Sequence, residues 1–61
     1  MEIKNYKENE TETVYSITSD ETISIGDIEQ NEEVKAVISG SQYNVEGDMD
    51  DPKLFWLTVT K

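Results

Sequence analysis

The side chains with which this chain could do chemistry are almost all carboxylates. Its 61 residues include 14 Asp and Glu and five Lys, and they contain no His, Cys or Arg. Nucleophile–base pairs, imidazole acid–base catalysis and guanidinium clamps all need the missing residue types. Two carboxylates can serve a glycosidase as acid and base, but so small a domain has little room for a water-excluding cleft. We therefore predict a protein that is not an enzyme and has no catalytic residue and no cofactor.

One acidic segment superficially resembles a calcium-binding loop. If Asp48 is taken as the first ligand, position 6 is Lys53 and position 12 is Val59. An EF-hand needs Gly and Glu at those two positions, so the spacing fails. We predict no metal site, and we keep a weak divalent-cation site at Asp48, Asp50 and Asp51 as a third hypothesis for the function.

The charge balance restricts the partners that this chain can have. The formal net charge is −9, which opposes direct binding to nucleic acid and to anionic membranes and favours a basic partner protein. The apolar run from Leu54 to Val59 is too short to cross a bilayer, and Met1 to Glu10 lacks the apolar core of a signal peptide. We expect a cytoplasmic protein. Abundant Lys, Asn, Glu and Ile without Arg suggest an AT-rich genome, such as that of a bacterium or its phage.

The residue types favour strands throughout a single domain, residues 1–61. β-branched and aromatic residues are frequent and Ala occurs once, so helix is expected to be scarce. Strands are predicted at residues 2–7, 12–18, 22–28, 33–39, 42–46 and 54–60.

The turn between residues 33–39 and 42–46 is predicted to be a two-residue hairpin loop. Gly40 at the first central position suits a type II′ turn with Ser41 at the second. This register sets Ile38 opposite Tyr43 and continues the apolar pairing along one face.

A second hairpin is predicted around Ser19–Glu21. Its register pairs Ile17 with Ile23, and a β-bulge at Gly26 returns Ile28 to the same face. The turn near Asn31 is compatible either with a strand connection or with a single helical turn.

The predicted fold class is therefore all-β, a small antiparallel meander of five to six strands. Its apolar face needs a cover. Because no amphipathic helix is predicted, the sheet is expected either to close into a barrel-like shape or to pair as a dimer. The last strand is apolar on both faces, so either it is the covered central strand of a barrel or Trp56 and Leu54 form a contact surface.

Alternating strand directions predict that the acids gather at one end of the sheet. In this meander the turns near Asn9, Asn31 and Asp48–Asp51 share that end. Eleven of the 14 acids map there: Glu8, Glu10, Glu12, Asp27, Glu29, Glu32, Glu33, Glu46, Asp48, Asp50 and Asp51. The alternative interpretation is that these are ordinary solvated loops.

The leading hypothesis is an acidic protein-binding inhibitor or modulator, encoded by a phage, that occludes a basic, nucleic-acid-binding surface of a host protein. Carboxylates fixed in place would substitute there for phosphates. The alternative is a structural or accessory interaction module without inhibitory activity, which forms a homo-oligomer, such as a homodimer, through its last strand. The predicted partner-binding residues are Glu29, Glu32, Glu33, Glu46, Asp48, Asp50, Asp51 and Trp56.

Overall fold

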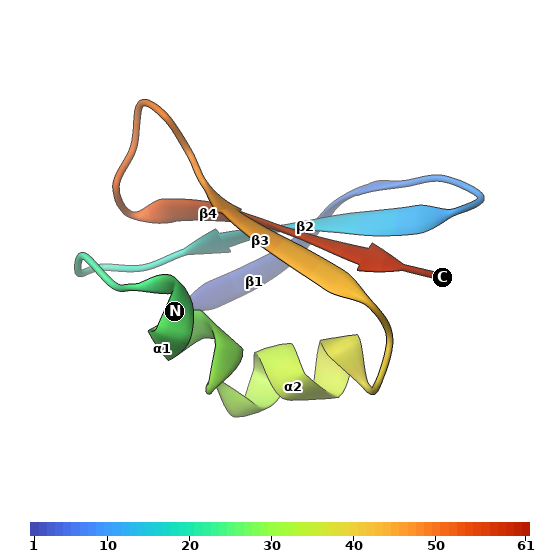
Figure 1. Cartoon of the computed structure of the whole chain (residues 1–61). Helices are drawn as coiled ribbons and strands as arrows, with labels where there is room; N and C mark the ends of the chain where they lie inside the picture. The colour runs from blue at the N-terminus through green and yellow to red at the C-terminus, as the bar shows by residue number, and fades with distance from the viewer.

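The computed structural model describes all 61 residues and contains one four-stranded antiparallel sheet with two short helices on one face (Figure 1). The elements follow the order β1 (Glu2–Glu8), β2 (Glu12–Thr18), α1 (Ile25–Glu29), α2 (Glu32–Ile38), β3 (Tyr43–Gly47) and β4 (Leu54–Thr60). The strand order in the sheet is β1-β2-β4-β3. The chain thus crosses from β2 to the far edge by way of the two helices, and β4 then returns to the middle.

β4 is one of the two inner strands of the sheet, and both of its backbone edges are paired. It pairs with β2 on one side and with β3 on the other. Phe55, Leu57 and Val59 are buried, whereas the residues between them are only partly buried. This alternation places the three buried side chains on the face that the helices cover.

A capping box formed by Ser24 and Asp27 starts helix α1 at the end of the loop that follows β2. The Ser24 side chain accepts a hydrogen bond from the Asp27 backbone N–H, and the Asp27 carboxylate accepts one from the Ser24 backbone N–H. These bonds satisfy two donors that a helix start leaves free. The helix then buries Ile28 completely.

Helix α2 is capped at both ends by its own sequence. The Asn31 side chain accepts from the backbone N–H groups of Glu33 and Val34. The helix ends at Ser39, which is left-handed with φ of 43°, and Gly40 follows with φ of 82°. Gly tolerates this conformation without steric cost, so it marks the end of a helix here.

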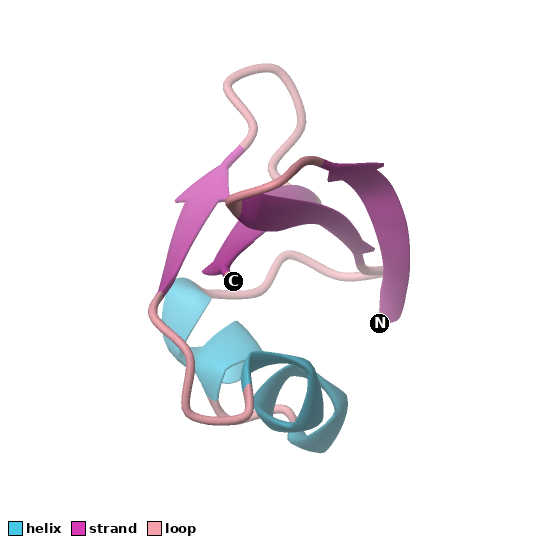
Figure 2. Ribbon diagram, turned by 90° about the vertical axis from the view of Figure 1, so that its right-hand side faces the viewer, coloured by secondary structure: helices cyan, strands magenta, loops and turns pink.

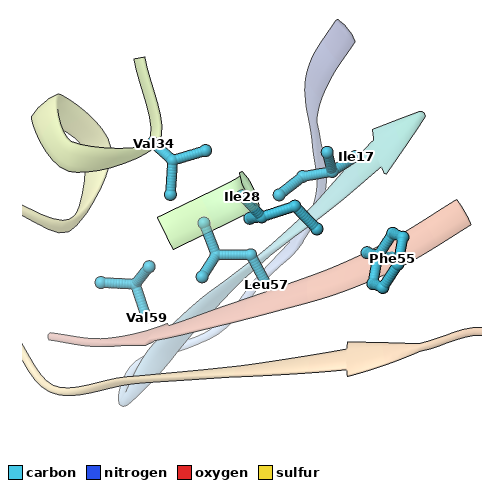
Figure 3. Close-up of a cluster of buried hydrophobic side chains, with 6 residues drawn as sticks. All are labelled: Ile17, Ile28, Val34, Phe55, Leu57 and Val59. Carbon is cyan, nitrogen blue, oxygen red and sulfur yellow. The ribbon is translucent and has the colours of Figure 1, made fainter. Parts of the chain in front are cut away.

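The core lies between the helices and the sheet and is small. Only seven residues are buried, and six of them are apolar. The apolar six come from β2, both helices and β4 (Figure 3), namely Ile17, Ile28, Val34, Phe55, Leu57 and Val59. The helices therefore supply the cover that the apolar sheet face requires.

Four of the six predicted strands are confirmed, as β1, β2, β3 and β4. The strands predicted at 22–28 and 33–39 are wrong, since these segments contain α1 and α2. The structure is mostly β, as expected, but these two segments are helical. Val34, Val37 and Ile38 contact the core from one face of α2, and Ile28 contacts it from α1. The sheet is open, so barrel closure and a fifth or sixth strand are not found.

Both predicted hairpins and the predicted bulge are wrong because helices α1 and α2 occupy the segments that would form them. Gly40 follows the C-cap of α2 and is not a II′ turn position, so Ile38 does not pair with Tyr43. The Ser19–Glu21 segment leads into α1, and Gly26 lies inside that helix. The irregularity in the sheet lies instead in β1, between Asn5 and Lys7.

Neither helix is long and apolar enough to cross a membrane.

Candidate functional site

The sheet face opposite the helices is uncovered, and we call it the open face (Figure 2). Cross-strand pairing defines its central row: Lys4 of β1, Ser16 of β2, Trp56 of β4 and Glu46 of β3. Directly paired residues point to the same side of a sheet. A tryptophan thus occupies the middle of a face that no other part of the chain covers.

Trp56 is held in place by two neighbours on the open face. The Tyr6 ring meets it edge to face, with 4.7 Å between centroids. Its indole Nε1–H donates to Asp48 Oδ1 over 3.1 Å. Tyr6 itself is 65% exposed, so this aromatic pair offers solvent a rigid apolar surface with a carboxylate attached.

Asp48 organises the loop between β3 and β4. Its Oδ2 atom accepts from the backbone N–H groups of Asp50 and Asp51, each at 3.1 Å. The hydrogen bond from Trp56, together with these two, holds the pKa of Asp48 below its usual value because all three donors favour the charged carboxylate. The loop is therefore tied to the open face by an ionised aspartate.

The loop after β2 lies at the same end of the sheet as the Asp48 loop. Thr18 pairs with Leu54, and the Ser19 backbone N–H donates to the Lys53 carbonyl over 3.1 Å. β1 begins there as well, since Glu2 pairs with Thr18. Six carboxylates consequently gather at this end, which we call the acidic end: Glu2, Asp20, Glu21, Asp48, Asp50 and Asp51.

The predicted gathering of the Asn9, Asn31 and Asp48–Asp51 turns at one end is wrong. The Asn9 turn joins β1 to β2 at the end where Glu12 pairs with Thr60, opposite the acidic end. Asn31 lies between the helices. Two strands of the expected meander are helices, so the direction of every later strand differs from the prediction (Figure 1).

Five of the eight predicted partner-binding residues lie close together. Glu46 pairs with Trp56, Trp56 bonds to Asp48, and Asp50 and Asp51 complete the loop. The other three lie on the helix layer. Glu29 accepts a hydrogen bond from the Tyr43 hydroxyl, while Glu32 and Glu33 occupy the first turn of α2.

Four further residues belong to this region although they are not predicted from the sequence: Glu2, Tyr6, Asp20 and Glu21. Their place directly after the predicted strand 12–18 is the available signal for Asp20 and Glu21, but the predicted hairpin sets them at the end opposite the Asp48 loop. Tyr6 precedes Lys7 at the β1 irregularity, and nothing in the sequence indicates its contact with Trp56.

The Asp48–Asp51 loop does not have the geometry of a cation site. No group of three Asp or Glu side chains is positioned to hold a metal ion. Both oxygens of Asp48 already accept hydrogen bonds, and Asp51 Oδ1 accepts from the Lys53 backbone N–H. These bonds explain the loop as a turn, which disfavours the cation hypothesis.

A single pocket is present, and it is small. Its volume is about 180 Å³, and it is lined by Met1, Glu2, Thr18, Ser19 and Asp20. Sites for small organic ligands usually measure about 300–1,000 Å³ and are mainly apolar. This pocket is smaller and more polar than such a site.

No protein-family model, curated protein or solved structure matches this chain.

Proposed function

We propose that this chain is a cytoplasmic protein-binding module that docks on a basic, nucleic-acid-binding surface of a host protein and inhibits it by occlusion. The observation that carries the proposal is the hydrogen bond from Trp56 to Asp48. It joins the aromatic pair of exposed Tyr6 and partly buried Trp56 to the carboxylates of the acidic end.

The two parts of this surface have complementary roles. The acidic end provides long-range attraction to a basic partner and replaces the phosphates that the partner otherwise holds. The Tyr6–Trp56 pair provides apolar contact, and aromatic residues commonly anchor interfaces. Asp48 accepts three hydrogen bonds from within the chain, so its position is fixed before the partner arrives.

The proposal is tested with two variants that carry the same net charge. Asp20→Asn with Asp50→Asn removes two charges from the acidic end, and neither carboxylate accepts a hydrogen bond in the folded chain. Glu10→Gln with Glu12→Gln removes two charges from the opposite end of the sheet. Each immobilised protein is used to capture proteins from bacterial lysate at about 50 and 200 mM salt, and captured proteins are tested for DNA binding with and without the chain.

We expect the Asp20/Asp50 variant to lose the partner and the Glu10/Glu12 variant to keep it. Capture by the unmodified chain is expected to weaken as salt rises, and the chain is expected to displace DNA from the partner. Equal capture by both variants, or a captured protein that still binds DNA, contradicts the proposal.

The second candidate function is self-association as an accessory module. Beside Trp56, the half-buried Val14 and Leu54 lie on the open face, and a second copy could cover them. Only the face of β4 could take part, because both of its backbone edges are already paired. Light scattering distinguishes the two functions: a stable dimer at micromolar concentration that Trp56→Ala abolishes supports self-association.

A further inference from the structure

The geometry points to β3 as a docking edge at which the partner adds an extended, basic segment as a fifth strand. This inference rests on the proposed function, and it specifies how the partner is held. β3 and β1 form the two edges of the sheet (Figure 2), and they differ in the features that decide whether an edge can accept a strand.

The β3 edge presents free backbone groups. The Thr60 N–H donates to the Gln42 carbonyl and the Asp48 N–H donates to the Leu54 carbonyl. In an antiparallel ladder only alternate residues bond to a given neighbour. The β3–β4 register continues this pattern, so within β3 it is Asn44 and Glu46 whose backbone groups bond to β4.

Tyr43, Val45 and Gly47 therefore direct their N–H and C=O groups away from the sheet. None of them contributes to the backbone hydrogen bonds made by turns, loops and caps. No other segment of the chain satisfies these groups, so they form a template for one more strand.

The β1 edge has the features that natural proteins use to prevent such pairing. It carries Lys4 and Lys7, and its register is interrupted between Asn5 and Lys7. Charged side chains, especially lysine, and β-bulges both discourage strand addition. β3 has no lysine, no proline and no irregularity in its pairing. The sequence thus protects one edge and leaves the other available.

The charges along β3 select a basic occupant. Glu46 lies on its open-face side, Asp48 follows its last residue, and Glu29 bonds to Tyr43 on the helix side. An extended segment with alternating Lys or Arg would place cations next to these carboxylates, whereas a second copy of this chain, with its net charge of −9, would be repelled.

The test uses a capped synthetic heptapeptide of alternating Lys and Thr, titrated into the ¹⁵N-labelled chain. We expect the amides of Tyr43, Val45 and Gly47 to shift and to become protected from hydrogen exchange. The amides of Asn44 and Glu46, which already bond to β4, should change less. The same peptide with Glu in place of Lys, and one N-methylated at every residue, should both fail to bind.

A pair of substitutions at one position separates the backbone from the side chain. Val45→Pro removes the outward N–H and leaves the β3–β4 bonds intact. Val45→Ala removes a comparable side-chain contact with the core but keeps the N–H. We expect the proline variant to bind the lysine peptide roughly tenfold more weakly than the alanine variant, the effect of losing one hydrogen bond together with the steric block of the proline ring.

Three outcomes overturn the inference. One is peptide-induced shifts confined to Asp20 and Asp50 at the acidic end, which would leave the proposed function in place. Another is equal binding by the N-methylated peptide, which decides the matter even if Val45→Pro fails to fold. The third is protection of the same amides in a concentration-dependent dimer without peptide, which would assign the edge to a second copy.

Discussion

The hydrogen bond from Trp56 to Asp48 joins the open face to the acidic end. The indole N–H is the largest cause of the lowered pKa of the Asp48 carboxyl, followed by the backbone N–H of Asp50. In the Trp56→Phe variant the aromatic ring stays but this donor is lost. We expect the pKa of Asp48 to rise toward its usual value, as measured by NMR titration of the side-chain carboxyl.

Asp27 provides the control for this titration. Its pKa is also lowered, by the backbone and side-chain hydrogen bonds from Ser24, and these bonds do not involve the open face. It should titrate identically in the variant and the parent chain. An unchanged Asp48 pKa in Trp56→Phe would mean that the backbone donors alone hold the loop.

Trp56 itself could be singled out from sequence, but its surroundings could not. One Trp in an apolar strand predicts a buried or interfacial role. Its partners come from β1 and from the β3–β4 loop, which are distant in sequence from each other. Only the strand order β1-β2-β4-β3 brings Tyr6 and Asp48 to the same ring.

The short helices depend strongly on their caps because each has few hydrogen bonds of its own. The Asn31 side chain satisfies two backbone donors at the start of α2. We expect Asn31→Ala to lower the free energy of unfolding by about 0.5–2 kcal/mol in urea denaturation. Asn44→Ala is the matched control, because the Asn44 side chain bonds only to the exposed Glu46, and a change within about 0.5 kcal/mol is expected there.

No loss in Asn31→Ala would show that α2 is held by packing alone, and an equal loss in Asn44→Ala would show that the effect is not specific to the cap. Val34, which is fully buried next to this cap, would then be the residue that fixes the helix.

The four strands could be predicted from the sequence, whereas the helices were missed because two periodicities compete in the same residues. Val34, Ala36 and Ile38 fit a strand alternation, and Val34, Val37 and Ile38 fit one helix face. The structure exposes Ala36 and packs the helical set against the core. The capping signals Ser24–Asp27 and Asn31 were present in the sequence and favour the helix. They were outweighed by the β-branched composition.

At the scale of the whole molecule, three carboxyl groups make the fold sensitive to acid. The pKa values of Glu8, Asp27 and Asp48 are lowered, by Lys61, Ser24 and Trp56 respectively as the largest cause. The unfolded chain therefore takes up these protons first as the pH falls. The stabilisation is complete above the unfolded pKa values, near pH 4, and is lost as the pH falls through the lower folded values.

Thermal melting followed by circular dichroism from pH 7 to pH 2 measures this loss. Asp27→Asn keeps a capping side chain that cannot be protonated, so its melting temperature should fall less steeply below pH 4. If the melting temperature of Asp27→Asn falls as steeply below pH 4 as that of the parent chain, Asp27 does not contribute to the acid sensitivity.

The placement of the acids likewise depends on the whole topology. The strand limits alone did not determine which turns share an end. Replacing two predicted strands by helices moved Asp20 and Glu21 beside the Asp48 loop and moved Glu8, Glu10 and Glu12 to the opposite end. An excess of acid was evident from composition, but its distribution required the fold.

The net charge of −9 gives salt opposite effects on folding and on binding. Carboxylates at the acidic end repel one another in the folded chain, and dissolved ions screen this repulsion, with a Debye length of about 10 Å at 0.1 M. We expect the melting temperature to rise between about 20 and 500 mM NaCl, and to rise less in the Asp20→Asn/Asp50→Asn variant. Over the same range, attraction to a basic partner should weaken. A melting temperature that falls with salt would mean that ion pairs such as Lys61–Glu8 outweigh the repulsion.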